Sequence, residues 1–269
     1  MSPLAPHRSP SPSASAWRPA VRALAAAALA GVLLAVTAVS AGAAGPVSGV
    51  SGGDLAAAKA KADAKKAKIT YPRAGRKAFK VATGRSAVAG SRGPLLRYRV
   101  SVEKDIKGVT ANQFAARVVQ TLSDERSWVG TGQVRLQRVP NSAEYDFTIY
   151  LATPQTRDSL CGDATRANPD RYTSCRNGDR VVLNVARWAK GVPKYGASLE
   201  TYRTYMINHE TGHRLGHHHQ KCTGSGRKAP VMQQQTLGLH GCKANAWPRV
   251  NGSLYEGPAG AYNDPIPSA

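Results

Sequence analysis

Acidic residues are scarce in this chain of 269 residues: 16 Asp and Glu stand against 37 Lys and Arg, a formal net charge of +21 at pH 7. The excess is uneven, because residues 54–99 alone hold 13 basic and 2 acidic residues. Such a block predicts a solvated segment that associates with anionic surfaces. No nucleic-acid-binding motif accompanies it, so we expect cell-wall polymers or lipid head groups as partners and no specific nucleic acid.

Residues 45–94 lack an apolar stripe. They are rich in Gly, Ser and Ala at first and then in Ala and Lys, so a helix formed there would have no face to bury. We therefore predict a mobile, basic, low-complexity linker over 45–94. No internal repeat is visible, and residues 95–269 have the length of one ordinary domain, which we expect to be monomeric.

The N-terminus combines basic residues, an apolar run and small residues. Two arginines precede the apolar run 23–39, and small residues with an Ala-Gly-Ala site follow at 40–45. This order is typical of a secretory signal peptide, which we predict for residues 1–44, with export from the cytoplasm to the cell envelope or beyond. An uncleaved membrane anchor is the alternative, because the apolar run is long for a signal peptide, although it is slightly shorter than the roughly 20 residues of a membrane span.

The chain has only four cysteines: Cys161, Cys175, Cys222 and Cys242. An even number in an exported chain favours disulfides. Three pairings are possible, and we predict Cys161–Cys175 with Cys222–Cys242 because short loops close at the lowest entropic cost. A thiolate metal ligand is the alternative role for Cys222, which lies three residues after His219.

From residue 95 onward the pattern predicts an α+β domain. Strands are expected where β-forming residues alternate, and helices where apolar residues recur at helical spacing. The expected strands cover 95–103, 133–139, 145–153 and 179–188. The expected helices cover 110–128 with Thr110 as N-cap, a short stretch after Pro154, 196–216 with Ser198 near its start, and a short stretch at 233–239 in an otherwise irregular C-terminal part.

Residues 208–222, NHETGHRLGHHHQKC, contain an H-E-x-x-H pattern made by His209, Glu210 and His213. On a helix, residues four apart share one face, so both imidazoles can reach one cation at about 2.0–2.1 Å. Glu210 points about 100° away from His209, where it can take a proton from a water bound to the metal. By itself the pattern also fits ordinary surface or core histidines.

Three further residues favour a metal site. Gly216 can take a positive φ, end the helix and turn the chain back. His219, three residues later, can then reach the metal from the side that the helix leaves open. Met232 predicts a turn that places a polarizable side chain beneath the ligands. Only His219 has the G-x-x-H spacing, so we expect the neighbouring histidines 217 and 218 to be solvated or to support the ligands.

The string H-E-x-x-H-x-x-G-x-x-H, followed by Met232 in a Met-turn, resembles the signature of the metzincin zinc proteases. Its wider context is similar to a family of secreted bacterial proteins with a zincin-like domain of unknown function, over about residues 95–250. The resemblance implies a twisted mixed sheet packed on two helices above a cleft, with an irregular part below. It also implies an edge strand beside an extended substrate, a role that we assign to 179–188.

Two details limit the resemblance. Some metzincins carry a tyrosine ligand two residues after the Met-turn methionine, whereas Gln234 stands at that position here, so we expect no tyrosine ligand from that turn. Residues 45–94 contain no cysteine, which excludes a cysteine-type inhibitory segment there.

We interpret the chain as an exported zinc metallopeptidase, a hydrolase of peptide or protein substrates. His209, His213 and His219 would hold Zn²⁺ as neutral imidazoles and leave a fourth position for water, with Glu210 as the general base. One alternative is a zinc amidase that cleaves wall peptides with the same chemistry. The other is a non-catalytic, zinc-stabilised module that binds anionic wall polymers; a structural zinc, however, normally has four protein ligands.

Overall fold

The computed structural model describes residues 68–163 and 172–267, all within one unit, Gly52–Ala269. The expected leader at 1–44 and the first part of the expected linker lie outside the described residues. Within the part of the chain that is described, no helix is long and apolar enough to cross a membrane.

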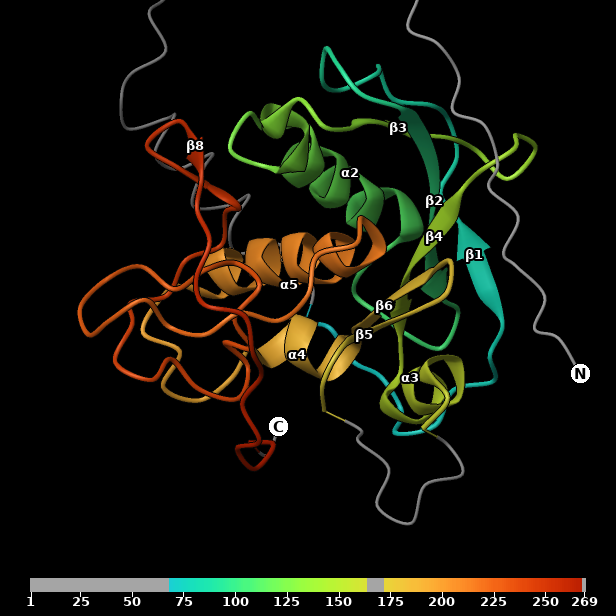
Figure 1. Cartoon of the computed structure of the whole chain (residues 1–269). Coiled ribbons are helices and arrows are strands. Elements are labelled where there is room, and N and C mark those ends of the chain that lie inside the picture. The colour runs from blue at the N-terminus through green and yellow to red at the C-terminus, as the bar shows by residue number, and fades with distance from the viewer. Residues whose placement is uncertain (1–67, 164–171, 268–269) are drawn as a thin grey trace, which may run out of the picture. The chain divides into compact units, whose positions relative to one another are not determined.

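Among the described residues, a six-stranded mixed sheet forms the centre of the fold (Figure 1). Its strands are β1 (Phe79–Val81), β2 (Leu95–Glu103), β3 (Arg135–Arg138), β4 (Phe147–Ala152), β5 (Cys175–Asn177) and β6 (Arg180–Asn184). The order is β1-β2-β4-β6-β5, and β3 also pairs with β2. Strands β2, β3, β4 and β6 are parallel to their neighbours among these four, whereas β1 and β5 run antiparallel.

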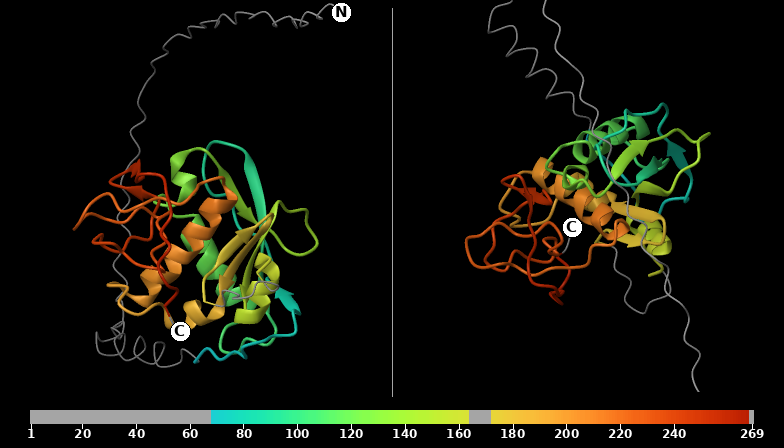
Figure 2. Two further views of the ribbon diagram at one scale, coloured as in Figure 1. Left: turned by 60° about the horizontal axis from the view of Figure 1, so that its bottom comes forward. Right: turned by 45° about the horizontal axis from the view of Figure 1, so that its top comes forward.

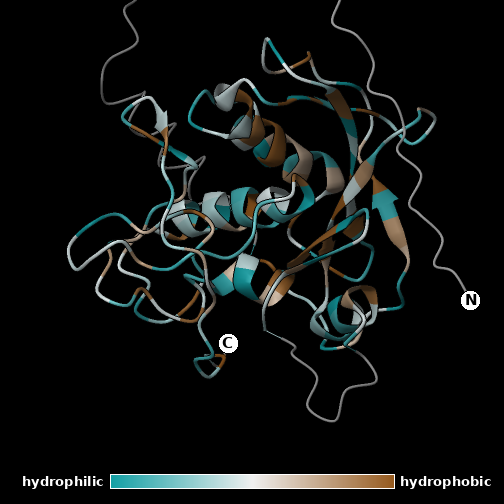
Figure 3. Ribbon diagram, viewed as in Figure 1, coloured by the Kyte–Doolittle hydropathy of each residue, from teal (hydrophilic) through white to brown (hydrophobic). Residues whose placement is uncertain are grey.

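The helices α2 (Ala111–Leu122) and α5 (Leu199–Arg214) pack against each other and against the sheet, on the same side of it in Figures 1 and 2. Phe114, Val118 and Leu122 of α2 are buried at the spacing expected from the sequence. Figure 3 shows the hydrophobic residues gathered in α2 and the central strands. Burial of each large apolar side chain contributes roughly 1.5–3 kcal/mol, so this layer is the main source of stability. The predicted α+β class is therefore confirmed.

Helix α2 begins where the sequence predicts. Thr110 accepts a hydrogen bond from the backbone N–H of Gln113 (3.2 Å), and the Gln113 side chain accepts one from the backbone N–H of Thr110 (2.9 Å). This reciprocal capping box satisfies two donors at the helix start. The helix ends at Leu122 rather than at residue 128, and the chain then forms a 3₁₀ helix, η1 (Trp128–Thr131).

The strand predicted at 179–188 is wrong in its second half and in its position. Asn184 ends β6 and caps the helix α4 (Val185–Lys190), accepting a hydrogen bond from the N–H of Ala186 (3.0 Å). β6 also lies between β4 and β5, so it is not an edge strand. The edge is β5, because a two-residue turn at 178–179 folds this short strand back onto β6.

The linker predicted over 45–94 and the domain start at 95 differ from the structure. From residue 68 the chain belongs to the fold: β1 pairs with β2, and Ala89 exchanges backbone hydrogen bonds with Leu136 (2.9 and 3.0 Å). The basic side chains did not prevent this, because strand pairing uses backbone groups and the exposed Lys80 points to solvent.

The carboxylate of Glu103 joins this N-terminal segment to the rest of the fold. It is fully buried, with 0% exposure, and accepts hydrogen bonds from the N–H of Lys77 (2.9 Å), the N–H of Thr153 (2.8 Å) and the hydroxyl of Thr156 (2.7 Å). Thr156 belongs to the helix α3 (Pro154–Cys161), which the sequence predicted after Pro154. One buried side chain therefore holds three segments together.

Replacing Glu103 by Gln is expected to lower the free energy of unfolding by about 1–3 kcal/mol. The amide keeps the shape of the carboxylate, but one oxygen becomes an NH₂ group. This group is a donor and cannot accept a hydrogen bond from the buried N–H and O–H groups that face it. Chemical denaturation measures the change, with Glu144→Gln at an exposed position as the control. An unchanged denaturation midpoint would show that the Glu103 contacts do not stabilise the fold.

The C-terminal part is irregular, as predicted, but the short helix expected at 233–239 does not form. Buried glutamine side chains take the place of helical hydrogen bonds there. The Gln235 amide donates to the carbonyl oxygens of Pro230 (3.1 Å) and Asn245 (2.7 Å), which cross-links two loops. The only other regular element described in this part is the ribbon of β7 (Arg249–Val250) and β8 (Ser253–Leu254).

Both predicted disulfides are present, Cys161–Cys175 and Cys222–Cys242. The first ties α3 to β5. The second encloses Met232 and closes the loop that follows the histidine string. Cys222 is therefore not available as a thiolate ligand.

Candidate metal centre

Helix α5 carries the H-E-x-x-H pattern between the sheet and the irregular C-terminal part (Figures 1 and 2). The Ser198 side chain caps its start by accepting a hydrogen bond from the N–H of Thr201 (3.1 Å). The helix ends at Arg214, and Gly216 takes a φ of +96°, a conformation that favours glycine. The chain turns back there, as the sequence predicts.

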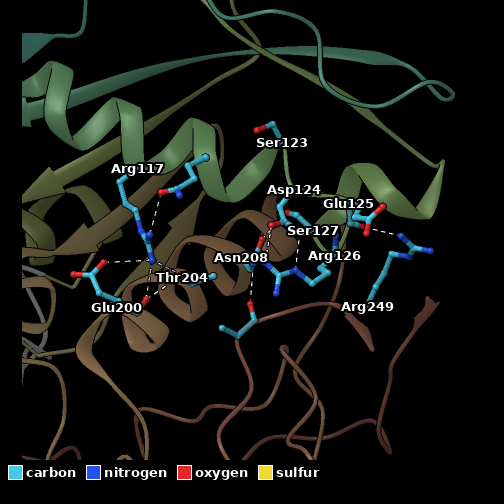
Figure 4. A network of polar contacts seen from close by, with 12 residues as sticks. Arg117, Ser123, Asp124, Glu125, Arg126, Ser127, Glu200, Thr204, Asn208 and Arg249 are labelled. Carbon is cyan, nitrogen blue, oxygen red and sulfur yellow. Dashed lines mark hydrogen bonds and ion pairs between the residues drawn. The ribbon is translucent and has the colours of Figure 1, made fainter. Parts of the chain in front are cut away.

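A polar network fixes α5 just before the pattern (Figure 4). Asn208 is fully buried; its side-chain oxygen accepts from the Ser127 hydroxyl (2.7 Å), and its amide donates to the carbonyl of Ala246 (2.8 Å). One turn earlier on the helix, Arg117 of α2 donates to the Thr204 hydroxyl (2.7 Å). The backbone that carries the histidines is therefore held from both sides.

His209, His213 and His219 converge, each offering a ring nitrogen within 4.8 Å of the other two. The Nε2 atoms of His213 and His219 are 3.0 Å apart. Two imidazole nitrogens bound to one tetrahedral zinc lie about 3.3 Å apart, so bringing all three to that spacing needs shifts of at most about 1.5 Å. The structure thus brings together the three histidines that the sequence predicted as ligands.

The hydrogen bonds of the His209 and His213 rings select the neutral tautomer that can bind a metal through Nε2. Nδ1 of His209 donates to the carbonyl oxygen of Val231 (2.8 Å), and Nδ1 of His213 donates to the carbonyl oxygen of His217 (2.8 Å). A carbonyl oxygen can only accept, so each Nδ1 carries a proton and each neutral ring has its lone pair on Nε2. These lone pairs face the common centre, an arrangement that suits a cation held by neutral imidazoles.

Burial keeps these histidines neutral. Burial, together with the charges of the neighbouring histidines, lowers the pKa of His209 well below its ordinary value and that of His213 to about 4. Burial also lowers the pKa of His219. Since metal ions bind the deprotonated ring, the site is prepared for a cation at neutral pH.

Glu210 lines the same cavity as the three histidines, a space of about 700 Å³, and is itself only 7% exposed. The other walls come from distant segments: β5 and the residues before it, the loop after Met232, and the C-terminal residues 262–266. The cavity is therefore large enough for several side chains of a peptide.

Met232 lies against the motif helix and is 1% exposed. A Cβ atom added at Gly212 would lie 2.5 Å from the Met232 sulfur and 2.6 Å from Trp128, so only glycine fits between the two ligands His209 and His213. The Met232 carbonyl accepts from the N–H of Gln220 (3.1 Å), one residue after the third histidine. The loop that carries Met232 thus positions the chain on both sides of the site.

The other histidines of the string have different surroundings. His217 stacks on Trp128, with ring centroids 4.1 Å apart, and its carbonyl oxygen accepts from His213, so it supports one of the candidate ligands rather than being free in solvent. His218 is exposed.

Sequence reasoning missed Arg176 and Tyr262, which both line the cavity. The backbone N–H of Tyr262 donates to the Gln234 side chain (2.7 Å), and its ring stacks on His240. Neither residue has a motif spacing, so no local signal marked them.

The zinc-free protein is expected to lose stability as the pH falls from about 6.5 to about 4. The unfolded chain protonates His213 near its ordinary value of 6.5, whereas the folded chain protonates it at about 4. Between these values the unfolded state binds more protons, so the free energy of unfolding decreases with decreasing pH; below about 4 this group adds no further loss. Denaturation of chelator-treated protein across this range measures the slope, and His213→Asn should flatten it. Equal slopes would contradict the prediction.

Residues 66–250 match the model of a family described as "Protein of unknown function (DUF3152)". The matched segment spans more than half of the chain and includes the whole sheet, the motif helix and the Met232 loop. Comparisons with curated proteins and with solved structures found no match. The chain therefore belongs to the DUF3152 family.

Proposed function

We propose that the protein is an exported, metzincin-like zinc peptidase. The observation that carries this proposal is the convergence of His209, His213 and His219 beside Glu210 in one large cavity. When bound, Zn²⁺ would act as a Lewis acid that polarises a carbonyl group and makes water a nucleophile near pH 7. The three histidines would hold it through the Nε2 atoms of at least His209 and His213, whose Nδ1 atoms are occupied.

Glu210 would move the proton. It follows His209 directly on the helix and faces the same cavity without belonging to the ligand group. A carboxylate in that position can accept a proton from the attacking water and donate it to the leaving amine. Its burial next to the histidines excludes bulk water that would otherwise compete for the proton.

The ligand count supports an open site over a structural one. Within the described residues, the metal-binding group contains three histidines and no fourth His, Cys, Asp or Glu. Both described disulfides occupy the chain's four cysteines. A structural zinc normally has four protein ligands, whereas a catalytic one keeps a position for water.

The edge strand β5 is the proposed platform for an extended substrate, in place of residues 179–188. Among the described strands it pairs with β6 alone, and Cys175 and Arg176 line the cavity. A peptide that pairs with its free edge would run along the histidine site. The two disulfides fit an oxidising compartment outside the cytoplasm, in line with export.

The test is digestion of a diverse peptide library by the full-length, zinc-loaded protein, with and without a chelator, read by mass spectrometry. The peptidase proposal is supported if the chelator abolishes cleavage and added zinc restores it. One zinc per chain with no cleavage of peptides or of wall peptides would overturn it and favour a zinc-stabilised binding module.

A further inference from the structure

Arg176 is a cationic side chain on the wall of the candidate active site. It occupies the middle of β5, is exposed, and lines the same cavity as the three histidines and Glu210. Its strand is held in place, because Cys175 is bonded to Cys161 and the Asn177 amide donates to the carbonyl of Leu160 (3.0 Å). The guanidinium therefore projects from a fixed support.

Among the described residues, the Arg176 side chain has no hydrogen bond or ion pair, in contrast to other arginines nearby. Arg157, for example, pairs with Asp158 (3.1 Å) and Asp163 (2.7 Å). The acidic groups of the cavity do not neutralise Arg176 either. The carboxylate of Asp264 contacts the ring nitrogen Nε2 of His240 (2.9 Å), and Glu210 belongs to the site itself. Within the described part of the chain, the five donors of this guanidinium therefore remain available to a ligand.

Strand β5 also packs against the motif helix α5, which carries His209, Glu210 and His213. A substrate residue beside the scissile bond would therefore lie in the cavity that Arg176 lines.

We propose that Arg176 binds a carboxylate of the substrate, so that the site prefers peptides with a carboxylate close to the scissile bond. This inference rests on the proposed peptidase function and names its substrate class. The planar fork of arginine binds a carboxylate through two parallel charge-assisted hydrogen bonds, which are stronger and more directional than neutral ones. The carboxylate can come from an Asp or Glu side chain or from the free C-terminus of a peptide.

The test uses matched fluorogenic peptides and the full-length, zinc-loaded protein. One peptide carries Glu next to the cleaved bond, a second carries Gln there, and a third carries Gln with a free C-terminal carboxylate where the other two are amidated. The wild type should cleave a carboxylate peptide with kcat/KM about 10–100-fold above the amidated Gln peptide. Whether the first or the third peptide shows the preference identifies the source of the carboxylate.

Arg176→Gln should abolish the preference, mainly through KM, so that the carboxylate peptide and the amidated Gln peptide are cleaved with equal kcat/KM. Arg180→Gln is the matched control, because it removes a positive charge from the paired strand β6 without touching the cavity wall. Arg176→Glu should reverse the preference towards a peptide with Lys at that position. Zinc content and denaturation midpoint of each variant show that the fold is intact.

A second readout separates this inference from the peptidase proposal. Fluorescence anisotropy measures binding of the same labelled peptides to zinc-loaded Glu210→Gln protein, in which no turnover is expected. The inference is supported, even if no peptide is cleaved, when a carboxylate peptide binds more tightly than the neutral peptide and the Arg176→Gln substitution abolishes this difference. Equal binding of charged and neutral peptides, or a preference that survives Arg176→Gln, overturns it while leaving the peptidase proposal to its own test.

Discussion

Glu210→Gln is expected to lower kcat and kcat/KM for peptide cleavage by about 10²–10⁴-fold, the usual contribution of a general acid–base group. The amide is nearly isosteric with the carboxylate but cannot accept the proton of the attacking water. Because the ligand group consists of His209, His213 and His219, the variant should keep one zinc per chain. Steady-state kinetics and elemental analysis on the same preparation measure both values.

Glu200→Gln is the matched control for this experiment. Glu200 lies in the first turn of the same helix, where its half-exposed carboxylate pairs with Arg203 (2.6 Å) and Arg117 (3.4 Å). Loss of these partly exposed ion pairs should change stability by about 1 kcal/mol and leave the kinetics unaffected. If Glu210→Gln retained wild-type turnover, Glu210 would not be the base; if it lost zinc, its role would be structural.

The second large effect is expected from two adjacent histidines. His219→Asn should lower zinc affinity by more than about 100-fold, beyond the 10–100-fold that the loss of a supporting contact causes. His218→Asn should leave affinity unchanged, because His218 is exposed and stands outside the ligand group. Competition with a fluorescent zinc chelator measures both constants.

Both variants remove one imidazole from the same three-residue run. A difference in their zinc affinity therefore shows that His219 itself binds the metal and that the number of histidines does not decide the affinity. The melting temperature gives a second comparison of the two variants. Zinc that binds only the folded state raises the melting temperature of the wild type and of His218→Asn, and it should leave that of His219→Asn unchanged. Equal zinc affinities for the two variants would remove His219 from the ligand set.

The candidate ligands are held in place by contacts from outside the motif helix. Val231 and His217 offer their carbonyl oxygens to the rings of His209 and His213, and Met232 packs on Gly212. The Val231 and Met232 contacts come from the loop that the Cys222–Cys242 disulfide closes, whereas the His217 carbonyl belongs to the turn directly after the helix. The position of the ligands therefore depends on the C-terminal part as well as on the helix.

Features with a local physical cause could be predicted from the sequence. The caps Thr110 and Ser198 depend on hydrogen bonds within three residues, and the face shared by His209 and His213 depends only on helical periodicity. The disulfide pairs follow from short loops, whose closure costs little entropy. The same reasoning placed three of the four predicted strands and the motif helix.

Features that depend on distant segments were decided by the tertiary structure. Residues 68–94 join the sheet through backbone pairing, which their basic composition does not show, and β5 rather than β6 forms the edge because of a two-residue turn. Arg176 reaches the cavity because a sheet edge, a helix and a loop meet there. Periodicity and spacing describe neighbours along the chain, whereas a substrate wall consists of neighbours in space. The sequence by itself therefore determined the candidate ligands and base, and the fold determined what surrounds them.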